Sequence, residues 1–100
     1  MTALRQWGAY ASAGGLIVLV QSDLLDPLPF RWAVPLVPST EAEGYPRLLA
    51  PVVVEGDRRL HAFVPGLTAI PTGVVGAWEF DASHASDRIV RAVDMMIGGV

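Results

Sequence analysis

The chain has 100 residues, of which 52% are hydrophobic and 17% charged, and its formal net charge is −3. This length fits one domain, residues 1–100, with a modest core, and its high apolar content predicts a surface for a partner or a second copy. The acidic balance and the absence of lysine argue against direct binding to nucleic acid. The absence of cysteine excludes disulfides, thiolate chemistry and zinc sites built on cysteine.

Short segments separated by proline and glycine predict a mainly β chain. The expected strands are Arg5–Tyr10, Leu16–Val20, Phe30–Val37, Pro51–Glu55 and Arg59–Phe63, with a short strand or extended segment at Leu67–Val75 and a lead-in to a helix at Trp78–Asp81. Turns are expected at Ala13-Gly14-Gly15 and at Gly56-Asp57, each joining two strands as a hairpin. Pro35 predicts that the third strand lies at an edge or carries a bulge, because proline cannot donate a ladder hydrogen bond. Pro38–Pro46 is expected to be a polar surface loop.

The run Leu16–Val20 is the longest strongly apolar stretch near the N-terminus. It is too short for a membrane span or a signal peptide, so we expect no membrane association. The absence of cysteine fits a reducing compartment, so we expect a cytoplasmic location.

The last eighteen residues, Ser83–Val100, form the longest segment without proline or early glycine. Apolar residues recur at Ile89, Val93 and Met96, a spacing that places them on one face of an α-helix. We expect a helix over Ser83–Ile97, with Ser83 as N-cap and Gly98-Gly99 as the stop. The predicted fold is therefore a small, SH3-like antiparallel barrel or sheet with one C-terminal α-helix.

The sequence provides little that indicates catalysis. His61 and His84 are isolated and share no metal-ligand spacing, and Asp23 and Asp26 are close in sequence without a visible cleft. Gly14-Gly15 lacks the strand–loop–helix setting of a phosphate loop. We therefore expect no enzymatic activity, no metal and no cofactor.

Several short stretches, in collinear order over nearly the whole chain, resemble the CcdB family of toxins. They are Val20-Gln21-Ser22-Asp23-Leu24-Leu25-Asp26, Val34-Pro35-Leu36, Pro51-Val52-Val53, Gly56-Asp57, Ala69–Gly76, Ser83-His84, Ala92, Met96 and the terminal Gly99-Val100. The resemblance implies a homodimeric toxin of a type II toxin–antitoxin pair. Such toxins bind the A subunit of DNA gyrase and trap its cleaved DNA complex, and the disordered C-terminal segment of an antitoxin neutralises them.

In the CcdB family the gyrase contact lies at the end of the last helix, as an aromatic residue, a glycine and an aliphatic residue. By position these correspond to Gly98, Gly99 and Val100, and the last two match. The family's tryptophan is absent at Gly98. Supporting contacts are expected from the three residues before the tip, Met95, Met96 and Ile97. The resemblance also implies an antitoxin peptide as partner, for which the polar loops Ala11–Gly15 and Ser39–Arg47 are the candidate contacts.

Two other functions are compatible with the sequence. The first is a homologue with the CcdB fold that keeps its antitoxin but has weak or lost gyrase poisoning, for which the missing tryptophan is the sequence feature. The second is an RNA-cleaving toxin of the MazF type, which shares the barrel fold. Such a nuclease needs polar and basic groups near the scissile phosphate, and Arg31 with Ser39 or Thr40 are the candidates.

Overall fold

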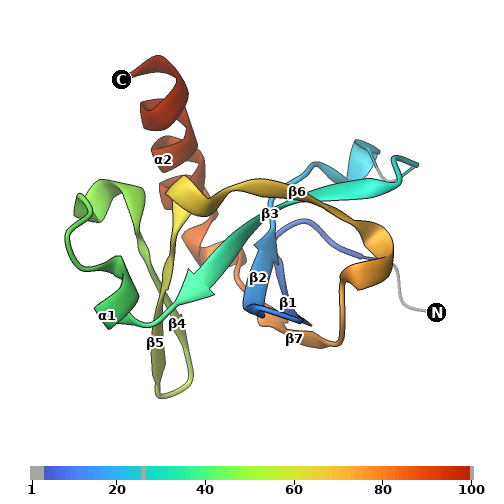
Figure 1. Cartoon of the computed structure of the whole chain (residues 1–100), viewed down its shortest axis with the longest axis horizontal. Helices are drawn as coiled ribbons and strands as arrows, with labels where there is room; N and C mark the ends of the chain where they lie inside the picture. The colour runs from blue at the N-terminus through green and yellow to red at the C-terminus, as the bar shows by residue number, and fades with distance from the viewer. Residues whose placement is uncertain (1–3, 26, 100) are drawn as a thin grey trace.

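The computed structural model describes residues 4–25 and 27–99. They form a nearly closed, barrel-like antiparallel sheet with one long C-terminal helix (Figure 1). The strands are β1 (Gly8–Ser12), β2 (Gly15–Leu19), β3 (Phe30–Val37), β4 (Val52–Glu55), β5 (Arg58–Ala62), β6 (Thr68–Pro71) and β7 (Trp78–Asp81). The α-helices are α1 (Ser39–Ala42) and α2 (Ser86–Gly98), and the short 3₁₀ turns are η1 (Asp23–Leu25), η2 (Arg47–Leu49), η3 (Val64–Gly66), η4 (Thr72–Val74) and η5 (Ser83–Ala85). The predicted mainly β fold is confirmed.

Two hairpins form where the turn residues predicted them. β1 pairs with β2 in the register Ala9↔Val18, and β4 pairs with β5 across Gly56-Asp57. Gly56 has φ +58°, a left-handed conformation that glycine adopts without steric cost. The first strand starts later than expected, at Gly8, because the amide of Gly8 donates to the carbonyl of Arg5 and closes a turn there.

The central strand of the sheet is β3, so the prediction of an edge or a bulge at Pro35 is wrong. The strand order is β4-β5-β3-β2-β1-β7, with β6 also paired to β3. One side of β3 pairs with β2, and the other side pairs first with β6, up to Ala33, and then with β5, from Leu36. Pro35 therefore lies where β3 changes neighbours, and its missing amide hydrogen interrupts neither ladder on that side.

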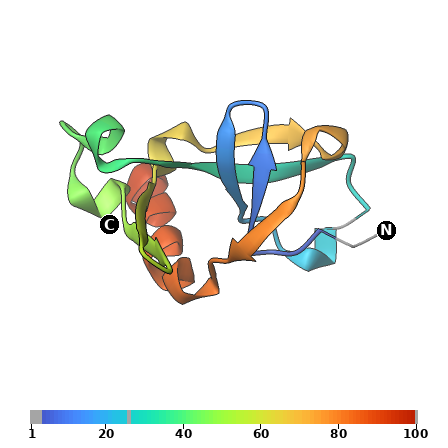
Figure 2. The ribbon, with the colours of Figure 1, turned by 90° about the horizontal axis from the view of Figure 1, so that it is seen from below.

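The predicted loop at residues 38–46 contains the short helix α1, and η2 follows it. Figure 2 shows α1, the β4–β5 hairpin and α2 at the same end of the molecule, remote from the N-terminus. The fold thus brings together, at one end, segments that are distant in sequence.

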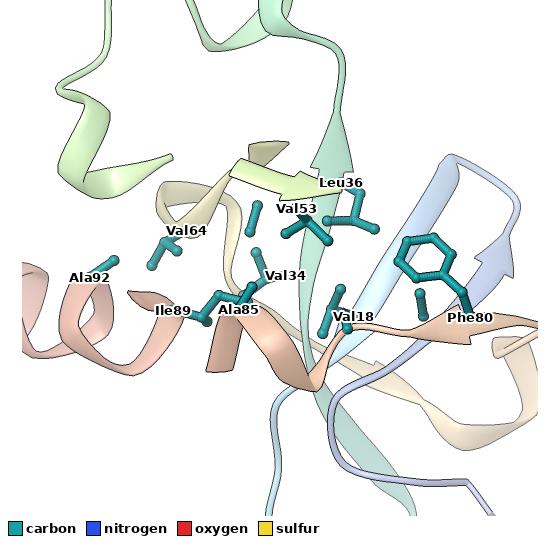
Figure 3. Packing of buried hydrophobic residues seen from close by; sticks show 12 residues of the cluster. Val18, Val34, Leu36, Val53, Val64, Phe80, Ala85, Ile89 and Ala92 are labelled. Carbon is teal, nitrogen blue, oxygen red and sulfur yellow. The ribbon is translucent and has the colours of Figure 1, made fainter. Parts of the chain in front are cut away.

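The core joins α2 to the inner face of the sheet. Ile89 of α2 is fully buried and belongs to one cluster with Val34 and Val53 (Figure 3). Ala85 and Ala92 belong to the same cluster and are fully buried, and small side chains at these positions let the helix approach the sheet closely. The apolar spacing read from the sequence therefore marks the buried face only in part: Ile89 is buried and Val93 is partly buried against the cluster, whereas Met96 is exposed.

The start of the C-terminal helix differs from the prediction. Ser83 is not an N-cap: residues Ser83–Ala85 form a 3₁₀ turn and α2 begins at Ser86. The amide of Ser83 instead donates to Asp81 Oδ1 at 2.9 Å. This hydrogen bond to the ionised carboxylate, with a further one from the Ser83 side chain, lowers the pKa of Asp81 below its ordinary value of 3.8.

Replacing Asp81 with alanine is expected to lower the free energy of unfolding at neutral pH by about 0.5–1 kcal/mol, the low part of the capping range because Asp81 is exposed to solvent. A carboxyl whose pKa is lowered in the folded state contributes stability above its unfolded-state pKa and loses it as the pH falls through the folded-state value. The difference between wild type and variant should therefore shrink in acid, below about pH 4. Urea unfolding at a fixed protein concentration measures it, with Glu79→Ala, an exposed carboxylate on the same strand, as the control. A difference that does not change with pH would contradict this role of Asp81.

Candidate functional site

The end of α2 presents apolar side chains to solvent. Ile97 is 82% exposed and Met96 is 45% exposed, whereas Met95 is partly buried. Figure 1 shows the helix extending beyond the sheet, so that its end stands clear of the barrel. Met96 and Ile97 are thus available to a partner, and Met95 is less so.

The glycines terminate the helix as predicted, with the boundary one residue later than expected. Gly98 is the last residue of α2, and Gly99 follows it in a left-handed conformation with φ +71°. The amide of Gly99 donates to the carbonyl of Met95 at 2.9 Å, which closes the helix end. Val100, the third residue of the predicted tip, lies outside the described residues.

An apolar cleft of about 260 Å³ runs along the same helix. Its walls come from α2, from β3 and from the segment around η1; the lining residues are Trp7, Val20, Gln21, Ser22, Leu25, Trp32, Leu67, Ile89, Val90 and Val93. Three of the lining residues are exposed, Leu25 by 46%, Trp32 by 43% and Val90 by 47%, and Leu24, next to Leu25 in the chain, is 91% exposed. Large apolar side chains that are exposed together in this way mark an interaction surface.

Sequence reasoning did not identify Leu24, Leu25 and Trp32 as candidate contacts. A pattern that indicates the first two was present, since two leucines directly follow the polar Gln21-Ser22-Asp23 in a loop. Trp32 carried a weaker indication, because aromatic side chains are common interface anchors but are equally typical of half-buried positions in a strand.

The polar residues that precede the two leucines hold the loop in place. Gln21 is buried, and its Nε2 donates to the carbonyls of Leu25 and Phe30 at 3.2 and 3.4 Å. The amide of Trp32 donates to Gln21 Oε1 at 3.4 Å. Asp23 Oδ1 accepts a hydrogen bond from the backbone amide of Gln6 at 2.8 Å. These contacts give Gln21 and Asp23 structural roles, while the leucines remain exposed.

The structure does not assemble the candidate nuclease group. Arg31 is buried near the start of β3, where its guanidinium donates to the carbonyls of Leu28 and Phe30. Ser39 and Thr40 lie beyond the other end of the same strand, exposed in α1. Most of the eight-residue strand β3 therefore lies between Arg31 and the two hydroxyls.

The other polar candidates are also separated. His61 lies in β5 and His84 in η5, and His61 Nδ1 donates to the carbonyl of Ala50 at 2.8 Å. Asp26 lies outside the described residues. Within residues 4–25 and 27–99, no group of three or more His, Cys, Asp or Glu side chains is placed to hold a metal ion.

The two loops predicted to contact an antitoxin are at different places in the fold. Ala11–Gly15 spans the β1–β2 turn, whereas part of the second loop lines a cavity of about 800 Å³ between α1, η2, the β4–β5 hairpin and α2; from this loop the lining residues are Ser39, Ala42, Glu43, Gly44, Tyr45 and Arg47. The second loop is therefore part of a concave surface.

In the described part of the chain, every helix is too short or too polar to cross a membrane.

One comparison with known proteins identifies the family. The family model for the CcdB protein matches residues 5–99, nearly the whole chain. The match includes the segment from Gln21 to Leu25, the sheet, and α2 with Gly98 and Gly99. These are the elements that carry the exposed apolar side chains. The chain therefore belongs to the CcdB family, and this membership supports its assignment as a toxin of a toxin–antitoxin pair.

Proposed function

We propose that this chain is a single-domain toxin of a type II toxin–antitoxin system that binds the A subunit of DNA gyrase and traps the gyrase–DNA cleavage complex. The observation that carries the proposal is the exposed apolar end of α2, with Met96 and Ile97 accessible and Gly98-Gly99 at its tip. By the resemblance, Gly98 and Gly99 correspond to two of the three positions that the family uses for gyrase, and Met96 and Ile97 precede them as supporting contacts. Because gyrase acts on the chromosome, the site of action is the cytoplasm.

We also propose that the toxin is a symmetric homodimer and that an antitoxin peptide neutralises it. Two-fold pairing is the commonest form of oligomer, and the exposed apolar residues beside the cleft supply surface that a second copy can cover. The toxin itself needs no catalytic group, metal or cofactor for this action, because gyrase makes the DNA break.

The second candidate is a homologue that has kept the fold and the antitoxin but poisons gyrase weakly or not at all. Gly98 favours this candidate, because it removes the aromatic ring that the family places at the tip. A nuclease is the least supported alternative, since Arg31 lies apart from Ser39 and Thr40.

Expression of the chain alone in bacterial cells distinguishes the three functions. We expect slowed growth together with trapped gyrase–DNA breaks, and light scattering of the purified protein should give twice the mass of the 10.7 kDa chain. A matched variant that ends after Ile97 removes the tip and should lose the trapped breaks while keeping the fold.

Each contrary outcome identifies a different function. Normal growth without breaks supports the silent homologue, and loss of mRNA without breaks supports a nuclease. A stable monomer at micromolar concentration contradicts the homodimer.

A further inference from the structure

Four arginines from three separate parts of the fold meet at one cavity. Arg47 comes from η2, Arg59 from β5, and Arg88 and Arg91 from α2. The cavity measures about 800 Å³. We call it the arginine groove. Because α2 packs against η2, residues far apart in the sequence face the same space.

The guanidinium groups of the groove have no protein partner in the described part of the chain: none of the four makes an ion pair or a side-chain hydrogen bond with it. The three remaining arginines are all engaged. Arg58 pairs with Glu55 at 3.2 Å, Arg5 lies over the ring of Trp78 at 5.0 Å, and Arg31 donates to backbone carbonyls. The unpaired cations are therefore collected at one place.

The groove is also electrostatically distinct from the rest of the molecule. Four of the seven positive charges line it, but only one of the ten negative charges, Glu43. Counting His61 as neutral, the residues that line the groove carry a formal net charge of +3, whereas the whole chain carries −3. An excess of like charge around one cavity destabilises the free protein and favours an anionic ligand.

The surface between the arginines is apolar and specifies the ligand further. Ala42, Leu48 and Val52 contribute to it. A groove of this size exceeds what a single phosphate group fills, and its cations are long side chains, unlike phosphate sites formed by backbone amides at a glycine-rich loop. Carboxylates that alternate with aliphatic side chains match both the guanidinium groups and the apolar surface.

We propose that the arginine groove binds an acidic peptide segment containing aliphatic side chains, and that this segment belongs to the antitoxin. The assignment to the antitoxin rests on the proposed function; the chemistry of the ligand rests on the groove itself. A disordered segment gains affinity by ordering on such an extended surface, and guanidinium–carboxylate pairs determine its position there.

The test is a titration of the purified ¹⁵N-labelled protein, followed by NMR of the arginine side-chain Nε–H resonances. The probe is a peptide of four Glu-Glu-Leu repeats, and the neutral control is a peptide of four Gln-Gln-Leu repeats. The acidic probe should shift the resonances of Arg47, Arg59, Arg88 and Arg91 and leave those of Arg5 and Arg31 in place. The neutral peptide should shift none of them.

Substitutions provide the quantitative measurement. Arg88 and Arg91 lie on the exposed face of α2. The double variant Arg88→Gln, Arg91→Gln should weaken binding of the acidic probe by about tenfold or more. Arg59→Gln and Arg58→Gln form a matched pair of neighbours in β5, of which only Arg59 lines the groove. Only Arg59→Gln should weaken binding, and circular dichroism verifies that each variant is folded.

Three results would overturn the proposal. They are equal affinity for wild type and the Arg88/Arg91 double variant, resonance shifts confined to the apolar cleft, and equal affinity for inorganic pyrophosphate and the acidic peptide. The last result would assign the groove to a phosphate-bearing ligand. A chain that causes no growth arrest contradicts the proposed function while the titration still reports on the groove. A chain that arrests growth but shows no arginine shifts contradicts the groove alone.

Discussion

Gly98→Trp is expected to strengthen gyrase poisoning on the order of a thousandfold. A tryptophan at the centre of an interface commonly contributes about 2 kcal/mol or more, and a homodimer presents the residue twice. If the two contributions add, about 4 kcal/mol corresponds to that change in affinity. Wild type should accordingly be a weak poison in a gyrase cleavage assay, and the variant should trap cleaved DNA at a much lower concentration.

The local backbone permits this substitution. Gly98 is the last residue of α2 and is exposed, so its helical conformation accepts an L side chain. Gly99 would not, because its φ is +71°. Gly98→Ala is the matched control: it removes the flexibility of glycine without adding a ring, and should stabilise the end of the helix with little effect on poisoning.

Two results would contradict the expected role of the tip. If wild type already traps cleaved DNA at nanomolar concentration and Gly98→Trp adds nothing, the ring is not required in this chain. If Gly98→Ala strengthens poisoning as much as Gly98→Trp, ordering of the helix end is the cause.

Ile89→Ala is expected to lower the free energy of unfolding by about 2–5 kcal/mol. Ile89 is fully buried where α2 meets the sheet, so the substitution removes apolar contacts and leaves a cavity. A domain of this size has a total stability of about 5–15 kcal/mol, so the loss is a large fraction of it. Chemical unfolding of wild type and variant at the same protein concentration measures the difference.

The same substitution at Ile97 provides the control within the same helix. Ile97 is 82% exposed, so Ile97→Ala should change stability by about 0.5 kcal/mol or less. Equal losses at the two positions would contradict the packing of α2 on the sheet through Ile89. If Ile97→Ala also reduces trapped cleavage complexes, then the exposed side chain acts in binding and not in folding.

Local patterns predicted the elements well where a residue's own neighbours determine its conformation. The bounds of β3 agree with the expected strand, and the Gly56-Asp57 turn joins β4 to β5, whereas Trp78–Asp81, expected only as a lead-in to the helix, forms the strand β7. The helix was predicted from its apolar spacing, and Gly99 terminates it through its left-handed backbone. These features depend on interactions over a few residues.

The errors concern interactions that depend on the whole fold. Pro35 indicated an edge strand, but β3 changes neighbours at that residue and is central. Ser83 has the side chain of an N-cap, yet Asp81 accepts the hydrogen bond at that end. Sequence separation also concealed the arginine groove, whose cations lie between positions 47 and 91 and meet only because α2 packs against η2.

The buried amide of Gln21 has an implication for how members of this family are recognised. The Val20-Gln21-Ser22-Asp23 stretch contributed strongly to the resemblance, but Gln21 and Asp23 form hydrogen bonds with other parts of the same chain. A signature of this kind identifies a common architecture, because replacing Gln21 would leave backbone groups without partners. The signature does not report the target of the toxin, since the exposed Leu24 and the exposed residues at the end of α2 can change without disturbing the signature. Selection can therefore retarget the molecule while its most recognisable residues remain unaltered.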